Sequence, residues 1–176
     1  MKSKYNLRKI VICGIFAALS IILGKLLAFN IGELFRISFE NLPIIFVGIA
    51  LGPLWGMAVG AVADLLGCLI VGYAINPIIT LGAVLIGAVS GIVSKLTRSL
   101  KIWARVFLSV FSAHLFGSVI IKSIGLSLFY GTDFWTLIPY RALNYALIIA
   151  LEYIIVYILM KNKEISARIK SIGGNQ

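Results

Sequence analysis

Long apolar runs, separated by short charged or turn-forming stretches, divide the chain into six predicted helices. The runs lie at about residues 9–29, 39–51, 54–72, 78–94, 106–122 and 136–160. Residues 41–63 and 65–94 contain no Asp, Glu, Lys or Arg, and a helix needs only about 20 mostly apolar residues to cross a bilayer. The pattern predicts an all-α integral membrane protein with six transmembrane helices, forming one domain over residues 1–176.

Short turn signals mark the predicted ends of these helices. Gly52-Pro53 separates the second run from the third, and Asn76-Pro77 precedes the fourth, where Asn-Pro favours turn initiation. The charged stretch from Asn30 to Glu40 is predicted to be a loop on the outer side of the membrane.

Composition supports the membrane assignment and explains the charge. The chain is 61% hydrophobic and 12% charged, with a mean hydropathy of +1.06, whereas soluble domains are about 45–50% apolar and roughly 25% charged. A net charge of +10 would suggest a nucleic-acid partner for a soluble protein, but here the charge follows a membrane rule, so no nucleic acid is expected. Most cations fall in three clusters: Lys2, Lys4, Arg8 and Lys9; Lys95, Arg98, Lys101 and Arg105; Lys161, Lys163, Arg168 and Lys170.

The three basic clusters predict the topology. Short loops rich in Lys and Arg stay in the cytoplasm, so an even number of spans must separate each pair of clusters. Four spans before Lys95 and two after it satisfy this condition and place both termini in the cytoplasm. An alternative with two spans between Asn41 and Ser94 would place the middle cluster outside.

The cations that lie outside the clusters are the first candidates for a binding site; they are Lys25, Arg36, Lys122 and Arg141. In the predicted topology they lie at the outer side, where positive charge is disfavoured unless negative charge compensates it. Internal salt bridges with the carboxylates on that side are one explanation; these are Glu33, Glu40, Asp64 and Asp133. The other explanation is an outward-facing pocket for an anionic ligand, because Arg can hold a carboxylate through two parallel hydrogen bonds.

Several polar and aromatic residues extend this candidate site. Asp64 lies in an uncharged run at a depth where ionisable groups usually face a cavity or a partner; that partner could be structural, such as Lys25 or Asn144, or a heterocycle with adjacent N–H donors. Arg141 shares a helix face with Asn144 or Tyr145. The aromatics at the outer level form either an interfacial belt or a stacking surface; they are Phe35, Phe39, Tyr73, Phe129, Tyr130, Phe134, Trp135 and Tyr140.

Signals for catalysis and metal binding are weak. Cys13 and Cys68 lack metal-type spacing, and no phosphate-binding loop is present. His114 and Glu152 are predicted to make helix contacts only, and Glu152 has no obvious partner. Neither a cofactor nor a resident metal is expected, and an intramembrane enzyme built on Asp64, His114 and Glu152 is a weaker alternative.

Three segments carry a resemblance to a known family: RISFENLP, LGPLWGMAVGAVADLLGC and YAINPIITLGAVLIGAVSG. Together with the six spans and the basic loop after the fourth, they resemble the folate-specific substrate-binding subunits (S components) of energy-coupling factor (ECF) vitamin transporters. The likeness covers nearly the whole chain.

The resemblance implies a subunit of the bacterial cell membrane that binds folate from outside. It implies association with a transmembrane coupling subunit (the T component) and two ATP-binding cassette ATPases, which would hydrolyse the ATP. S components commonly carry an Ala-x-x-x-Ala face on the first helix that docks on the T component, and Gly14 and Ala18 take these positions here.

The resemblance also suggests roles for the candidate residues. Asp64 or Asn76 would bind the pterin edge, and aromatics such as Tyr73, Tyr130 and Trp135 would sandwich its rings. The cations Arg36, Lys122 and Arg141 would hold the glutamate tail, and Glu40 and Asn144 complete the predicted set. There are two alternatives to a folate-binding subunit. The first is an S component for another vitamin or small anionic heterocycle, and the second is an autonomous secondary transporter.

Overall fold

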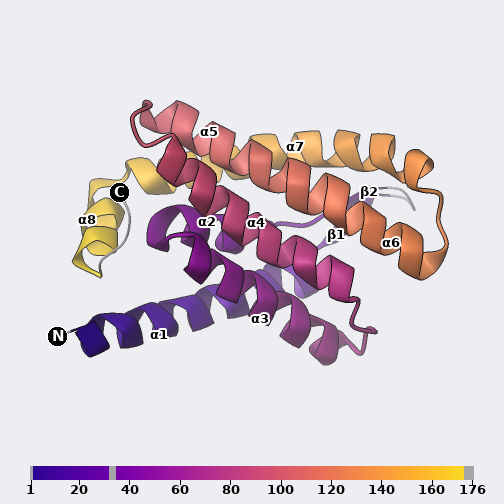
Figure 1. The fold of residues 1–176 in the computed structure, drawn as a ribbon, viewed down its shortest axis with the longest axis horizontal. Helices are drawn as coiled ribbons and strands as arrows, with labels where there is room; N and C mark the ends of the chain where they lie inside the picture. The colour runs from indigo at the N-terminus through magenta and orange to yellow at the C-terminus, as the bar shows by residue number, and fades with distance from the viewer. Residues whose placement is uncertain (1, 32–34, 173–176) are drawn as a thin grey trace.

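The computed structural model describes residues 2–31 and 35–172, with side chains described for residues 7–29 and 37–172. Helix α1 (Lys2–Ile21) continues as a π-helix, η1 (Ile22–Leu26), and is followed by an antiparallel pair of short strands, β1 (Phe29–Ile31) and β2 (Phe35–Ile37). The other elements of the described chain are helices (Figure 1), in the order α2 (Asn41–Leu51), α3 (Pro53–Val71), α4 (Pro77–Leu96), α5 (Ile102–Ala113), η2 (His114–Ile121, a second π-helix), α6 (Lys122–Tyr130), α7 (Phe134–Lys161) and α8 (Lys163–Ser171).

Five helical stretches of the described chain are long and apolar enough to cross a membrane: Leu7–Leu26, Pro53–Val71, Pro77–Leu96, Ile102–Tyr130 and Phe134–Lys161. The remaining predicted span corresponds to α2, which has only 11 residues. Its length of about 16 Å is roughly half of a 30 Å bilayer core. The helical membrane fold is therefore confirmed, whereas six crossings and cytoplasmic termini remain predictions.

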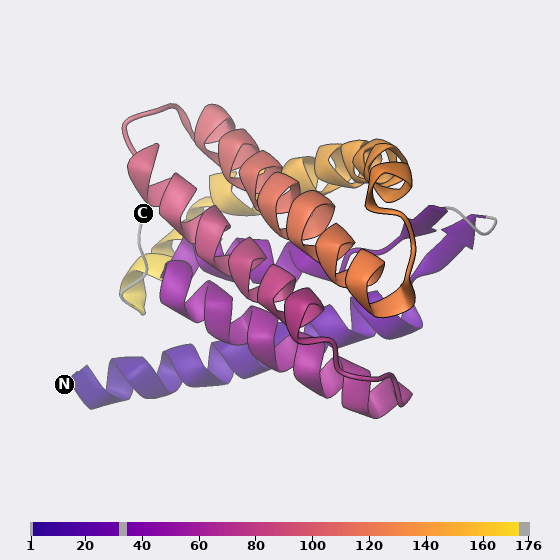
Figure 2. The ribbon, with the colours of Figure 1, turned by 45° about the vertical axis from the view of Figure 1, so that its right-hand side comes forward.

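The two ends of the bundle differ in charge. The start of α1, α8 and the α4–α5 turn gather at one end, and the strand pair, the α3–α4 turn and the α6–α7 turn gather at the other (Figures 1 and 2). Because the three basic clusters lie at the start of α1, around the α4–α5 turn and around the α7–α8 junction, all three share the first end. We call the two ends the basic end and the hairpin end.

Helix α2 forms the centre of the core. All its residues are buried, and it contacts α1, α3, α4, α5 and α7. This position follows from its sequence, because a helix that is apolar on every side is buried on every side. Its one strongly polar side chain, Asn41, therefore lies inside the bundle.

Glycines allow α2, α3 and α4 to approach closely, as the small-residue stripe in α3 predicts. A Cβ atom on Gly56 of α3 would lie 2.6 Å from the Gly87 carbonyl oxygen of α4 and 2.8 Å from Gly48 Cα of α2. A Cβ on Gly60 would lie 2.8 Å from the Ala83 carbonyl carbon. These helices therefore touch backbone to backbone.

Three segments differ from the predicted elements. The stretch predicted as an outer loop contains the β1–β2 pair, in which Phe29 lies opposite Ile37. The fifth helix does not end at Lys122 but continues through η2 and α6 to Tyr130. Helix α8, which was not predicted, forms because its isoleucines recur at helical spacing and bury Ile169 against the core.

Replacing Gly56 by Ala is expected to push α3 away from α4 and lower the free energy of unfolding by about 1–3 kcal/mol, as in other overpacked cores. Gly14→Ala is the matched control, because a Cβ at Gly14 meets no atom within 4 Å. The midpoint of thermal unfolding of each purified variant in detergent checks this prediction. Equal midpoints for both variants would contradict the close helix contact.

Candidate ligand-binding cavity

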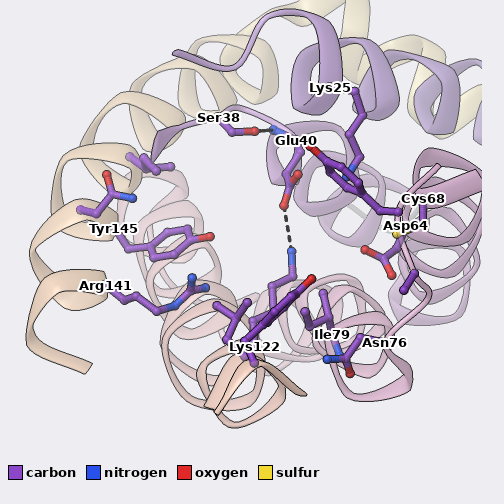
Figure 3. A pocket seen from close by; sticks show the side chains of 16 residues that line it. Lys25, Ser38, Glu40, Asp64, Cys68, Asn76, Ile79, Lys122, Arg141 and Tyr145 are labelled. Carbon is purple, nitrogen blue, oxygen red and sulfur yellow. Dashed lines mark hydrogen bonds and ion pairs between the residues drawn. The ribbon is translucent and has the colours of Figure 1, made fainter. Parts of the chain in front are cut away.

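A cavity of about 230 Å³ opens at the hairpin end of the bundle (Figure 3). Its walls come from η1, the β2–α2 connection, α3, the α3–α4 turn, α4, α6 and α7. Three cations (Lys25, Lys122 and Arg141) face two carboxylates (Glu40 and Asp64) across it. The cavity therefore has an excess of positive charge inside an apolar bundle.

The structure brings together most of the residues that the sequence suggested for a ligand site. Eight of the ten line the cavity: Glu40, Asp64, Tyr73, Asn76, Lys122, Tyr130, Arg141 and Asn144. Trp135 does not line it; this side chain is 78% exposed and packs edge to face on Phe134. The side chain of Arg36 lies outside the described residues. The ligand-binding roles of these residues remain predictions.

An ion pair between Glu40 and Lys122 spans the middle of the cavity (Figure 3). Lys122 Nζ lies 2.9 Å from Glu40 Oε1 and also donates to Asn41 Oδ1 at 3.4 Å. Two glycines leave space for these side chains. A Cβ on Gly24 would lie 2.7 Å from Glu40 Cβ, and one on Gly82 would lie 2.6 Å from Lys122 Cγ.

Arg141 lies on the α7 side of the cavity and is held from two directions. Its Nη2 donates to the Ser118 carbonyl oxygen at 2.7 Å, and its guanidinium carbon lies 5.3 Å from the centre of the Tyr145 ring, a cation–π distance. Its Nε is buried and has no acceptor among the described residues. A buried N–H without an acceptor is costly, so the described residues do not satisfy this guanidinium completely.

Asp64 lies on the opposite side of the cavity, on α3. Thr80 Oγ1 donates to Asp64 Oδ2 at 2.6 Å, and no hydrogen bond within the described residues reaches Oδ1. Of the alternatives considered for Asp64, a structural bond to Lys25 or Asn144 is not seen among the described residues. The Lys25 ammonium instead lies 5.4 Å from the Tyr73 ring centre. Asp64 therefore keeps one oxygen available to a ligand.

Asn76 lines the cavity, but its side chain also has a structural role. It caps α4, with Oδ1 accepting from the N–H groups of Ile78 and Ile79 at 3.0 and 3.3 Å. Its Nδ2 donates to the Gly125 carbonyl oxygen at 2.9 Å. Because three of the four hydrogen bonds that an Asn side chain can make are used, Asp64 is the better candidate for binding a heterocycle.

Two π-helical stretches position cations that line the cavity. Stretch η1 carries Lys25, and η2 ends directly before Lys122. In η2 the Lys122 N–H bonds to the Gly117 carbonyl rather than to that of Ser118, and the Ser118 carbonyl accepts the hydrogen bond from Arg141. Short π-helical stretches often mark functional sites, and the sequence carries no signal that predicts their register.

The predicted set omitted some residues that line or support the cavity. Lys25 and Tyr145 line it, and both carried a usable signal: Lys25 is one of the outer cations, and Tyr145 follows Arg141 by one helical turn. Thr80 supports Asp64 from α4, and only the packing of α3 against α4 reveals this contact.

His114 and Glu152 form a pair behind the Arg141 side of the cavity. His114 Nε2 lies 2.7 Å from Glu152 Oε2, and neither side chain is exposed. The sequence predicted helix contacts for both residues but did not identify the partner of Glu152. The structure shows that α7 packs against η2 and brings the two side chains together.

The amino-acid sequence matches the family model for the substrate-specific component of ECF transporters over residues 8–163. A 73-residue stretch is 33% identical to the uncharacterized protein MG313 homolog of Mycoplasma pneumoniae, of which the chain spans a quarter of the length. The chain is also 27% identical to the folate transporter FolT of Leuconostoc mesenteroides, over 96% of this chain and 93% of that protein.

Solved structures show the same fold. A crystal structure of FolT bound with folic acid is 26% identical, with a TM-score of 0.66 over 84% of this chain and 89% of that one. An S component for biotin from an ECF-type ABC transporter has a TM-score of 0.69 at 21% identity, over 92% of this chain and 95% of that one. The family match, which extends over most of the chain, and the shared fold lead to one conclusion: this membrane protein belongs to the family of ECF transporter substrate-specific components.

Proposed function

We propose that this protein binds folate at the hairpin end and passes it to an ATP-driven importer made of a T component and two ATP-binding cassette ATPases in a bacterial cell membrane. The observation that carries the proposal is the layout of the cavity. Arg141 and Tyr145 face Lys25 and Asp64 across it, with the Glu40–Lys122 pair between them (Figure 3). The Arg141 guanidinium thus lies across the cavity from an open carboxylate oxygen of Asp64.

Folate has chemistry that matches both sides. Its pterin ring offers N–H donors for Asp64 Oδ1, and Tyr73 and Tyr130 at the cavity wall offer aromatic faces. Its glutamate tail carries two carboxylates for Arg141 and Lys122, and Arg36 on β2 is a further candidate. The cavity volume of about 230 Å³ is below the usual 300–1,000 Å³ of ligand pockets, so part of the molecule would extend through the opening.

The similarity to the folate transporter of Leuconostoc mesenteroides and to the FolT structure with folic acid supports folate as the ligand. The similar fold of the biotin S component makes another vitamin the alternative.

The outer face of α1 supports docking of a T component. Gly14 and Ala18 are both exposed, so they do not serve packing within the chain. Exposed apolar side chains such as Leu7, Val11 and Ile15 flank them. Small residues four apart allow another helix to approach closely, so this face suits a transmembrane helix of the coupling subunit.

Purified protein in detergent is expected to bind about one folate per chain, measured by quenching of Trp fluorescence or by calorimetry, with riboflavin, thiamine and biotin as controls. Arg141→Ala should weaken binding by an order of magnitude or more, because a ligand carboxylate loses a charged partner. Arg168→Ala on the exposed face of α8 is the matched control. No folate binding by folded wild-type protein would rule out the ligand; unchanged affinity in Arg141→Ala would rule out the tail assignment.

Asp64→Asn is expected to weaken folate binding roughly tenfold or more, because hydrogen bonds to a charged acceptor contribute the most. Asn retains the volume of Asp and can still accept from Thr80. Asp133→Asn is the matched control, because Asp133 caps α7 outside the cavity and Asn caps a helix equally well. Titration of both variants with folate checks the prediction, and equal affinities would remove Asp64 from the site.

Ala18→Trp is expected to abolish ATP-dependent folate uptake in liposomes that contain the cognate T component and ATPases, because the ring prevents close helix approach. Folate binding to the isolated subunit should not change. Leu81→Trp, exposed on α4, is the control. Normal uptake by Ala18→Trp would contradict docking through this face, and uptake without the ATPases would favour an autonomous transporter.

A further inference from the structure

On the basis of the proposed function, we infer that His114 and Glu152 are positioning residues for the binding cavity. Neither side chain lines the cavity. Together they hold Arg141 in the orientation in which it binds the anionic tail of the ligand.

The pair is too costly to be explained by packing alone. Both side chains are fully buried, and Glu152 Oε1 has no hydrogen-bond partner among the described residues. Burying such a pair costs desolvation free energy that well-packed apolar side chains of the same size would avoid. Ionisable residues inside membrane helices usually serve a function, so the contacts of this pair indicate what it does.

Both supports of Arg141 belong to residues that contact His114. The first support is the Ser118 carbonyl, which accepts from Arg141 Nη2 at 2.7 Å; the Ser118 hydroxyl lies 3.1 Å from His114 Nδ1. The second is the Tyr145 ring, which lies under the guanidinium and 5.1 Å from the centre of the His114 ring. The orientation of the imidazole therefore affects both contacts at once.

Glu152 determines the orientation of the imidazole. With Oε2 at 2.7 Å from Nε2, the carboxyl group holds one ring nitrogen, and the Ser118 hydroxyl engages the other. The ring thus has a hydrogen-bond partner at each nitrogen. Loss of the Glu152 carboxyl would free the ring to rotate or to shift away from Tyr145.

The effect should reach Arg141 rather than Lys122. A connection to Lys122 runs through Asn41, whose Nδ2 lies 3.5 Å from the Ser118 hydroxyl, and a hydrogen bond of that length is weak. The contacts to Arg141 are shorter and more direct. The pair is therefore expected to affect recognition of the part of the ligand that Arg141 binds.

A comparison of folate with the neutral amide of pteroate, which keeps the pterin and the aminobenzoyl group but carries no carboxylate, tests the inference in Glu152→Leu, where Leu offers no acceptor to His114 Nε2. Folate should bind roughly tenfold more weakly than to wild type, within the range of coupled neighbours, whereas the affinity for the amide should stay unchanged. Glu164→Leu, at an exposed carboxylate on α8, is the matched control. In the Arg141→Ala background, Glu152→Leu should have no further effect on folate affinity, because the residue through which it acts is gone.

Three outcomes separate the explanations. No folate binding by wild-type protein would overturn the proposed function itself. Folate binding that weakens in Arg141→Ala but not in Glu152→Leu, or equal weakening for folate and the pteroate amide, would overturn only the positioning role. If Glu152→Leu does not fold, Ser118→Ala decides, because it removes the hydroxyl next to His114 and keeps the carbonyl. It should weaken folate binding selectively, and no selective loss would overturn the inference.

Discussion

Charged side chains inside an apolar helix bundle must find their partners within the protein, and this constraint determines the layout of the molecule. Lys122 on α6 pairs with Glu40, which lies 82 residues earlier in the chain. Arg141 on α7 donates a hydrogen bond to the Ser118 carbonyl of η2, and Glu152 pairs with His114. These bonds join segments that are distant in sequence around one cavity. Lys122 and Arg141 are therefore both supports of the site and candidate ligand contacts, whereas His114 and Glu152 lie outside the cavity lining.

The basic end of the bundle meets a different requirement. Here α2, α3 and α4 touch through glycines, and α2 is apolar and buried over its whole length. Close backbone packing of this kind suits membrane helices, where no hydrophobic force between helices is available. The short α2 begins at the level of the cavity, so Asn41 at its first turn can accept from Lys122. The bundle is therefore tightly packed toward the basic end and contains its polar cavity at the hairpin end.

The sequence predicted much of this arrangement from charge alone. Cations outside the basic clusters pointed to one site, and Lys25, Lys122 and Arg141 do line one cavity. The parts that could not be predicted depend on how each helix is rotated about its axis. The Thr80–Asp64 and His114–Glu152 contacts join residues on different helices. Hydrophobic periodicity does not determine which polar side chains of two neighbouring helices point toward each other. Trp135 lies outside the cavity for the same reason: it is on the first turn of α7 but faces away from the bundle.

The fold alone does not select the ligand. Structures of FolT and of a biotin S component match this chain with TM-scores of 0.66 and 0.69, so the backbone distinguishes them poorly, and selectivity must come from side chains. In this chain the side chain of Arg141 and the open oxygen of Asp64 line the cavity and are the candidate contacts for such selectivity. A molecule that can pair with only one of these two side chains would leave the other without a hydrogen-bond partner. The lost binding free energy is how polar sites reject wrong ligands. A ligand with N–H donors at one end and a carboxylate at the other avoids that cost.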